Sequence, residues 1–181
     1  QPVPVPRMPG VQVNIPPLSA ATNRMGYFTQ TPDPDGLYRS VPMFIRMGEN
    51  YYPSLSVAVL KEALGGNIMV TLGTEKLMDE EGRVAKLMLG QKDIPVDESG
   101  RFLVKYYGPA NTFRHLSAVD VWSGTIPAAE LKDKIVLFGV TTTGVFDLRP
   151  IPFQSENYPG VEIHANVIEN ILRDDYLVRP N

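Results

Sequence analysis

The chain has 181 residues, 43% of them hydrophobic, with a net charge of −3 and no cysteine. This length and composition suffice for the core of one domain and require no second core. The lack of a long basic run argues against a nucleic-acid partner, and the lack of cysteine excludes disulfides and thiolate metal sites. No run reaches the roughly eighteen apolar residues of a membrane-spanning helix.

The first seventeen residues are rich in proline, whose fixed φ and missing N–H favour an extended segment. We predict that residues 1–17 form a linker or edge segment, with an edge strand at Val11–Ile15 that Pro16 and Pro17 end. Residues 18–181 are predicted to form the domain. Its first elements are expected to be a helical turn and two strands, at Leu18–Asn23, Met25–Gln30 and Leu37–Met47.

A dense turn signal, Thr31–Gly36, separates these two strands. Its Asp33 and Asp35 alternate like the first ligands of an EF-hand calcium loop. The places of the later ligands are taken by Leu37, Val41 and Phe44. We therefore predict ordinary turn chemistry here, in which the carboxylates accept nearby backbone N–H groups, and no metal site.

The middle of the chain predicts one covered helix, several strands and a short helix. Ser54 is placed to cap a helix at Leu55–Leu64, which Gly65 and Gly66 end. Strands are expected at Asn67–Leu72, Val84–Leu89 and Arg101–Tyr107, with a solvated turn at Glu75–Arg83 and a short helix from Ser117 to Trp122. In the third strand, the alternate residues Phe102, Val104 and Tyr106 share a face that we expect to be buried.

The segment Lys134–Val140 is too short for a typical helix and too apolar for a strand with one wet face. We predict a buried central strand there, followed by a long loop and a helix at Val161–Leu172. On that helix an apolar face is opposed by a polar one; the apolar face holds Val161, Ala165, Ile168 and Leu172, and the polar face holds Glu162, Asn166, Glu169, Asn170 and Arg173. His164 falls at the margin of the apolar face and is predicted to point inward.

The chain is thus predicted to be a single α/β domain with a mixed β-sheet flanked by helices. No catalytic motif supports an enzyme. The glycines of Gly139–Gly144 have the spacing of a phosphate loop, but Val145 and Phe146 replace its Lys and Ser/Thr. The histidines are His115 and His164, and neither lies in a recognisable triad or metal motif. We predict no catalysis, metal or cofactor in this domain.

A small polar ligand could bind between the central strand and the last helix. Hydroxyl groups after the strand, the loop carboxylate Asp147 and the free N–H groups where the helix begins near Gly160 would supply polar contacts. The candidate ligand-binding residues are Thr141, Thr142, Thr143, Asp147, Glu162 and His164. The alternative is that Asp147 braces the loop and His164 is a hydrogen-bonded core residue.

Several stretches together resemble a known sensory family. They are Leu131–Gly139, Asp147, Pro150–Pro152, Pro159–Asn166, and Asp33–Arg39, which matches an Asp-x-Asp-Gly-x-x-Arg element. The chain resembles the extracellular sensory domain associated with cyclases and histidine kinases, of the second CHASE type. The resemblance extends over most of Leu18–Pro180, and the family's further N-terminal portion with a transmembrane helix is not matched.

The resemblance implies a periplasmic or extracellular input domain of a membrane-bound signalling protein at a bacterial inner membrane. The expected output domain is an adenylate or guanylate cyclase. Histidine kinases, serine/threonine kinases and diguanylate cyclases are the alternative outputs, and a soluble enzyme using Asp147, Glu162 and His164 is the competing class. The expected partners are a small polar ligand, a second copy through the parent protein, and the membrane through flanking segments.

Overall fold

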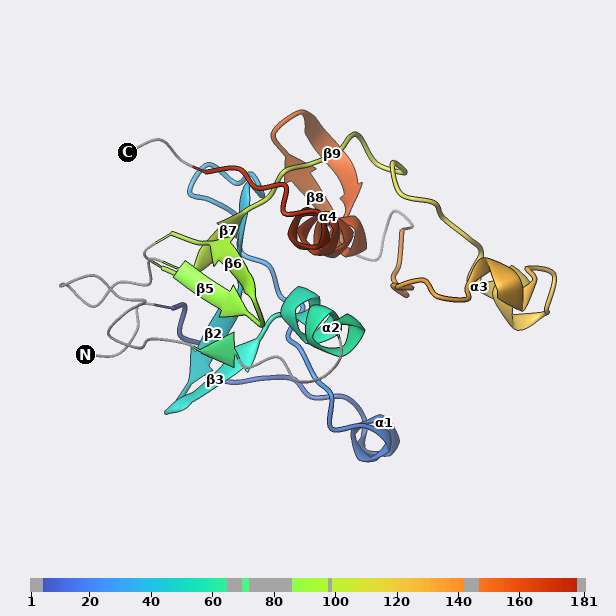
Figure 1. The fold of residues 1–181 in the computed structure, drawn as a ribbon, viewed down its shortest axis with the longest axis horizontal. Helices are drawn as coiled ribbons and strands as arrows, with labels where there is room; N and C mark the ends of the chain where they lie inside the picture. The colour runs from blue at the N-terminus through green and yellow to red at the C-terminus, as the bar shows by residue number, and fades with distance from the viewer. Residues whose placement is uncertain (1–4, 65–69, 72–85, 98, 142–146, 179–181) are drawn as a thin grey trace.

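The computed structural model describes residues 5–64, 70–71, 86–97, 99–141 and 147–178 (Figure 1). The helices are α1 (Pro16–Ala21), α2 (Leu55–Ala63), α3 (Ala118–Trp122) and α4 (Gly160–Leu172), with a 3-10 turn η1 at Ala128–Glu130. The strands are β1 (Ser40–Pro42), β2 (Phe44–Met47), β3 (Asn50–Pro53), β4 (Val70–Thr71), β5 (Lys86–Leu89), β6 (Lys92–Pro95), β7 (Arg101–Leu103), β8 (Leu148–Ile151) and β9 (Gln154–Pro159). Within these residues no helix has the length and apolar character to cross a membrane.

The strands form small antiparallel sheets. β1 pairs with β7, β2 with β3, and β8 with β9, while β4, β5 and β6 form a three-stranded sheet in that order. Parallel contacts occur at two isolated bridges, Arg7–Arg46 and Tyr27–Ser54. The first bridge aligns the proline-rich segment with β2, because Pro6 accepts the N–H of Arg46 and Met8 donates to its carbonyl. The predicted class, a single α/β domain, is confirmed.

One hydrophobic core joins the sheets to α2 and α4, which lie against each other (Figure 1). Phe102 of β7, Tyr158 of β9 and Ile163 of α4 are completely buried in it. Burial of each such side chain contributes on the order of 1.5–3 kcal/mol. Tyr106 extends the core, because its ring meets that of Tyr158 edge to face at 5.4 Å and its hydroxyl donates to the carbonyl of Tyr38.

The predicted helix α2 is confirmed at its beginning and along its length. Ser54 is its N-cap residue, and the hydroxyl accepts the N–H of Val57 at 3.3 Å. Val57 and Leu60 are buried in the core, and α2 contacts α4. Leu64 is the C-terminal cap, and the predicted glycine stop at Gly65 and Gly66 lies outside the described residues.

The strand predictions are partly right. Leu37–Met47 contains β1 and β2, and Arg101–Tyr107 begins with β7. Of the face predicted to be buried, Phe102 and Val104 are buried and Tyr106 is half-buried. The described parts of Asn67–Leu72 and Val84–Leu89 hold β4 and β5, and the turn Glu75–Arg83 lies outside the described residues.

Two other strand predictions are wrong. Val11–Ile15 forms no strand, and its apolar side chains are more than half exposed. Met25–Gln30 pairs at one bridge residue, Tyr27. Alternation alone does not make a strand, since the backbone also needs a neighbouring strand to pair with. The helical turn predicted at Leu18–Asn23 is present, shifted toward the N-terminus, as α1.

The prediction of a buried central strand at Lys134–Val140 is also wrong. The segment is extended but pairs with no strand in the described part of the chain, and Val136 and Phe138 are 59% and 86% exposed. Leu137, by contrast, packs against the core. An apolar composition therefore does not by itself place a segment inside a sheet, because a strand also needs a neighbouring strand to pair with.

The long loop predicted after this segment contains a hairpin. β8 and β9 pair antiparallel, with an irregularity between Arg149 and Ile151, and β9 leads directly into α4. The sequence did not predict these strands because it has prolines at 150, 152 and 159, and proline is rare in paired strands away from edges and bulges. The hairpin therefore fixes where α4 begins.

Candidate functional site

The N-terminal turn of α4 is built on the hairpin that precedes it. The N–H of Gly160 donates to the backbone carbonyl of Asp147 at 2.8 Å. A Cβ atom at position 160 would lie 2.9 Å from Cγ of Asp147 and closer still to Oδ1, so a larger residue there would displace the Asp147 carboxylate. The Asp147 carboxylate, half-exposed, pairs with Arg149 at 3.1 Å. The backbone of Asp147 thus ties the loop to the first residue of the helix, while its carboxylate contacts Arg149.

His164 lies one turn further along α4 and faces inward, as predicted. It is 7% exposed, and its Nδ1 is 2.9 Å from the hydroxyl of Ser56 on α2. Burial lowers the pKa of His164, although a hydrogen bond with the backbone of Phe28 and the nearby charge of Asp147 oppose this shift. His164 is therefore held as a neutral, hydrogen-bonded residue between two helices.

Glu162 is buried on the other side of the first turn, with 2% of its surface exposed. Its Oε1 accepts the N–H of Asn111 at 2.8 Å and lies 3.2 Å from Nε2 of His115. Its Oε2 is buried with no hydrogen-bond partner among the described residues. A buried carboxylate oxygen without a donor costs about 1–3 kcal/mol or more. Oε1 of Gln30, whose amide donates to the carbonyl of Gly160, is a second buried acceptor without a partner in the described part of the chain, at this end of α4.

The face of α4 predicted to be polar is covered by residues 104–111. Asn170 accepts the N–H of Lys105 at 2.9 Å and donates to its carbonyl at 3.0 Å. Asn166 accepts the N–H of Tyr107 at 3.0 Å and donates to the hydroxyl of Tyr158. Both asparagines are completely buried. Asn166 and Asn170 therefore bind the backbone of Lys105 and Tyr107 to α4, and we name this pair the asparagine ladder.

Three of the predicted site residues lie in or beside the first two turns of α4, but each of them contacts different residues. Asp147 contacts Arg149, Glu162 contacts Asn111 and His115, and His164 contacts Ser56. Thr141 is exposed, and Thr142 and Thr143 lie outside the described residues. The sequence reasoning missed His115 and Asn111, which are distant from Glu162 along the chain.

The Asp-x-Asp-Gly-x-x-Arg element forms a second polar cluster, and it is structural. Asp35 accepts the N–H of Leu37, and the guanidinium of Arg39 contacts both Asp33 and Asp35. Hydrogen bonds from Arg39 lower the pKa of the Asp35 carboxyl to about 2. Asp33 also accepts the hydroxyl of Ser40. The predicted turn chemistry is confirmed. The described residues contain no group of three or more His, Cys, Asp or Glu side chains able to hold a metal.

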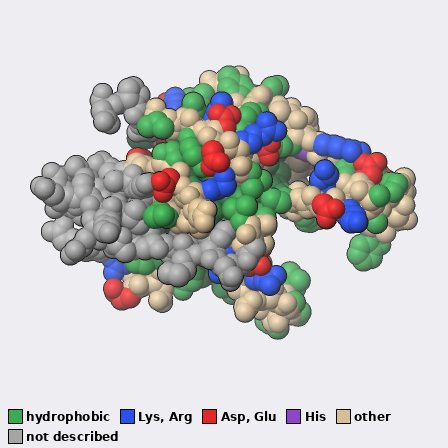
Figure 2. Space-filling view, viewed as in Figure 1, with side chains coloured by type: hydrophobic (Ala, Val, Ile, Leu, Met, Phe, Trp, Pro, Cys, Tyr) green, Lys and Arg blue, Asp and Glu red, His purple; other side chains and the backbone are tan. Residues whose placement is uncertain are grey.

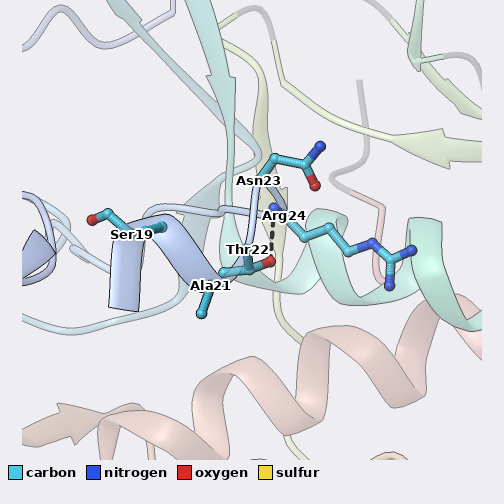
Figure 3. Close-up of a pocket in the computed structure, with 6 residues that line it drawn as sticks. Ser19, Ala21, Thr22, Asn23 and Arg24 are labelled. Carbon is cyan, nitrogen blue, oxygen red and sulfur yellow. Dashed lines mark hydrogen bonds between the residues drawn. The ribbon is translucent and has the colours of Figure 1, made fainter. Parts of the chain in front are cut away.

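Two hollows on the surface lie elsewhere. One of about 510 Å³ is lined by Ser19–Arg24, where the chain leaves α1 and the N–H of Arg24 donates to Thr22 (Figure 3). Another of about 410 Å³ lies between this segment and α2, and the ion pair of Arg24 with Glu62 spans it. Both are formed mainly by exposed side chains and contain none of the predicted ligand-binding residues.

The model of the CHASE2 domain family matches residues 2–181. The chain belongs to the CHASE2 family. The resemblance carried by the motifs around Asp33 and Pro159 is thereby confirmed. CHASE2 domains are extracellular sensory domains that occur with cyclases and kinases, and the domain itself is non-catalytic. No curated protein and no solved structure matches the chain.

The geometry of this CHASE2 domain agrees with a sensory role. The carboxylates and the imidazole around α4 have separate partners, so the contacts found here do not assemble a nucleophile, a base and an orienting group in series. The polar groups instead connect α4 to the hairpin, to α2 and to residues 104–115. α4 is therefore the element to which these three parts of the domain are joined.

Proposed function

We propose that this CHASE2 domain is the periplasmic input domain of a membrane-bound nucleotide cyclase and that it binds a small polar ligand at the first turn of α4. The sensory role follows from the family, and the ligand site rests on the unsatisfied Oε2 of Glu162. A donor group on a ligand would satisfy this buried oxygen, and Asp147 and the N-terminal end of α4 would supply further polar contacts. His164, held by Ser56, contributes to the shape of the site.

Signalling requires more than binding. A ligand shifts an equilibrium between two states only by its difference in affinity for them. Glu162 offers such a difference, because its carboxylate already ties α4 to Asn111 and His115. A ligand that competes for this carboxylate would favour a state in which that contact is loosened.

The ligand site is tested in the full-length parent protein in membranes, by measuring stimulus-dependent output and thermal stability together. Glu162→Gln and Asp147→Ala should lose the response, with a melting temperature close to that of the unchanged protein. The matched control is Glu169→Gln, on the same helix, where the carboxylate pairs with Arg173. A normal response in both site variants, each correctly folded, would rule the site out.

The output is tested separately, by incubating the same membranes with ATP or GTP. Formation of a cyclic nucleotide supports the cyclase assignment. Phosphorylation of the protein from ATP in its absence, or formation of cyclic di-GMP, would replace it with the kinase or diguanylate-cyclase alternative. A soluble enzyme using Asp147, Glu162 and His164 would instead show turnover by the isolated domain that His164→Ala abolishes.

A further inference from the structure

Both histidines of the chain form contacts at the first two turns of α4. Nε2 of His115 lies 3.2 Å from Oε1 of Glu162, and Nδ1 of His164 lies 2.9 Å from the hydroxyl of Ser56. Positions 162 and 164 are about 200° apart around a helix, so the two contacts lie on opposite sides of α4. One contact ties α4 to residues 111–115, and the other ties α4 to α2.

Histidine is the side chain whose charge ordinarily changes between about pH 5 and 8. Acidic and basic side chains keep their charges over most of this range, and Figure 2 shows them intermingled on the face in view, where histidine contributes little of the surface. Acidification over this range therefore adds charge mainly at His115 and His164.

A proton on His115 would strengthen its contact with α4. The His115 side chain is 34% exposed, whereas the Glu162 side chain is 2% exposed and its Oε2 has no hydrogen-bond partner in the described part of the chain. Protonation turns the hydrogen bond into an ion pair, and opposite charges at this distance attract. Arg114, the neighbouring charged residue, pairs with Glu130 and does not compete for Glu162. Acid should therefore hold residues 111–115 more firmly against α4.

A proton on His164 would have the opposite effect. The imidazole is 7% exposed, and its hydrogen-bond partners, the hydroxyl of Ser56 and the backbone of Phe28, are neutral. A charge placed there loses its hydration without gaining an ion pair, which is costly. Protonation therefore favours a state in which α2 and the segment around Phe28 move away from α4 and let water reach the imidazole.

The charged groups around this imidazole do not reverse that cost. Asp147, from the loop before β8, attracts the proton, but its carboxylate is half-exposed and pairs with Arg149. On α2, Lys61 and Glu62 are exposed in the last turn, at the opposite end from Ser56. Burial outweighs the attraction by Asp147, and the pKa of the imidazole is lowered.

We propose that acidification transfers the hold on α4 from α2 to residues 111–115, so that this CHASE2 domain responds to protons. Because the two contacts respond in opposite directions, acid changes how α4 is held and does not merely loosen the domain. A sensory domain outside the membrane meets the pH of its surroundings directly, and a buried neutral histidine beside a second, carboxylate-bound one is suited to report it.

The test is amide hydrogen exchange by NMR on the 181-residue chain at about pH 7.5 and 5.5, corrected for the intrinsic pH dependence of exchange. Protection of Leu55 and Ala58, in the first turn of α2, should fall by up to about tenfold, the limit for one histidine of ordinary pKa 6.5 in the open state. Protection of Asn111, which donates to Glu162, should rise about two- to fivefold. The Lys105 amide, bound to the asparagine ladder, is the internal reference and should not change.

Three variants assign the two effects. His164→Gln should abolish the loss at α2 and keep the gain at Asn111, and His115→Gln should do the reverse. Glu162→Gln keeps an acceptor for the Asn111 amide but removes the charge, so the gain should disappear. Because His164 is buried and its replacement can destabilise the fold, the unchanged chain supplies a second measurement. The loss at α2 should follow the titration of the His164 imidazole resonances, and the gain at Asn111 should follow those of His115.

Three results would overturn the proposal. The first is an equal loss of protection at every amide in acid, which would mean that acid only destabilises the domain. The second is unchanged protection at both α2 and Asn111. The third is a loss at α2 that persists in His164→Gln or does not follow the His164 resonances. No ligand is added, so these results stand apart from the outcome for the ligand site.

Discussion

Replacing Asn170 tests whether the asparagine ladder on α4 stabilises the domain. Asn170→Ala removes two hydrogen bonds to the backbone of Lys105, at 2.9 and 3.0 Å, from a side chain that is completely buried. Each bond contributes about 1 kcal/mol net, and the Lys105 groups left without partners add to the loss. Alanine regains roughly 0.6 kcal/mol of helix propensity. The expected decrease in the free energy of unfolding is about 2–3 kcal/mol.

Urea unfolding monitored by circular dichroism measures this change, provided that the slope of the transition is unchanged. The control on the same helix is Glu169→Ala, a partly exposed residue whose replacement should cost less than about 0.5 kcal/mol.

Asn170→Asp adds a chemical check. It keeps the acceptor for the Lys105 N–H but turns a carboxylate oxygen toward the Lys105 carbonyl. Its stability should approach that of Asn170 at acidic pH, where a protonated Asp donates again. A cost below 0.5 kcal/mol for Asn170→Ala, by the same threshold, would refute the ladder.

Two further predictions concern the beginning of α4. Gly160→Ala should displace the half-exposed Asp147 carboxylate at a cost of about 1 kcal/mol or less, because the end of that side chain can move, and Asp147→Ala should remove this cost; additive losses in a urea double-mutant cycle would contradict the contact. For His164, burial lowers the pKa from 6.5, so the unfolded chain binds the proton more readily. Stability should therefore fall as the pH drops below about 6.5. His164→Gln should flatten that part of the stability profile, and an unchanged slope would show that other groups cause it.

The helices were the part of the fold that sequence predicts well. Ser54 marks the beginning of α2, and the 3.6-residue period defines α4. Both signals act over a few residues and do not depend on the rest of the fold. Periodicity also places His164 at the margin of the apolar face, where the structure finds it pointing inward.

The errors arise where a residue's surroundings are set by distant parts of the chain. Asn166 and Asn170 fall on the polar face by angle, but the sequence does not show that residues 104–111 lie over that face. Glu162 was included in the candidate site without its neighbour His115, because no local motif joins them. Phe138 was predicted to be buried and is exposed. An apolar side chain favours burial, but the sequence does not show whether another part of the chain lies over it.

The contact between Glu162 and His115 offers a test of how the proposed ligand site is linked to the rest of the domain. The Glu162 carboxylate holds Asn111 and His115 against α4. A ligand that takes this carboxylate away from His115 would free that segment, so a state in which the segment is free should bind the ligand more tightly. His115→Gln removes the imidazole that pairs with Glu162 and leaves Asp147 and His164 unchanged. This variant should shift the stimulus response of the full-length protein toward the liganded state, as measured by its output without stimulus. An unchanged output and an unchanged response would show that the contact between Glu162 and His115 plays no part in signalling.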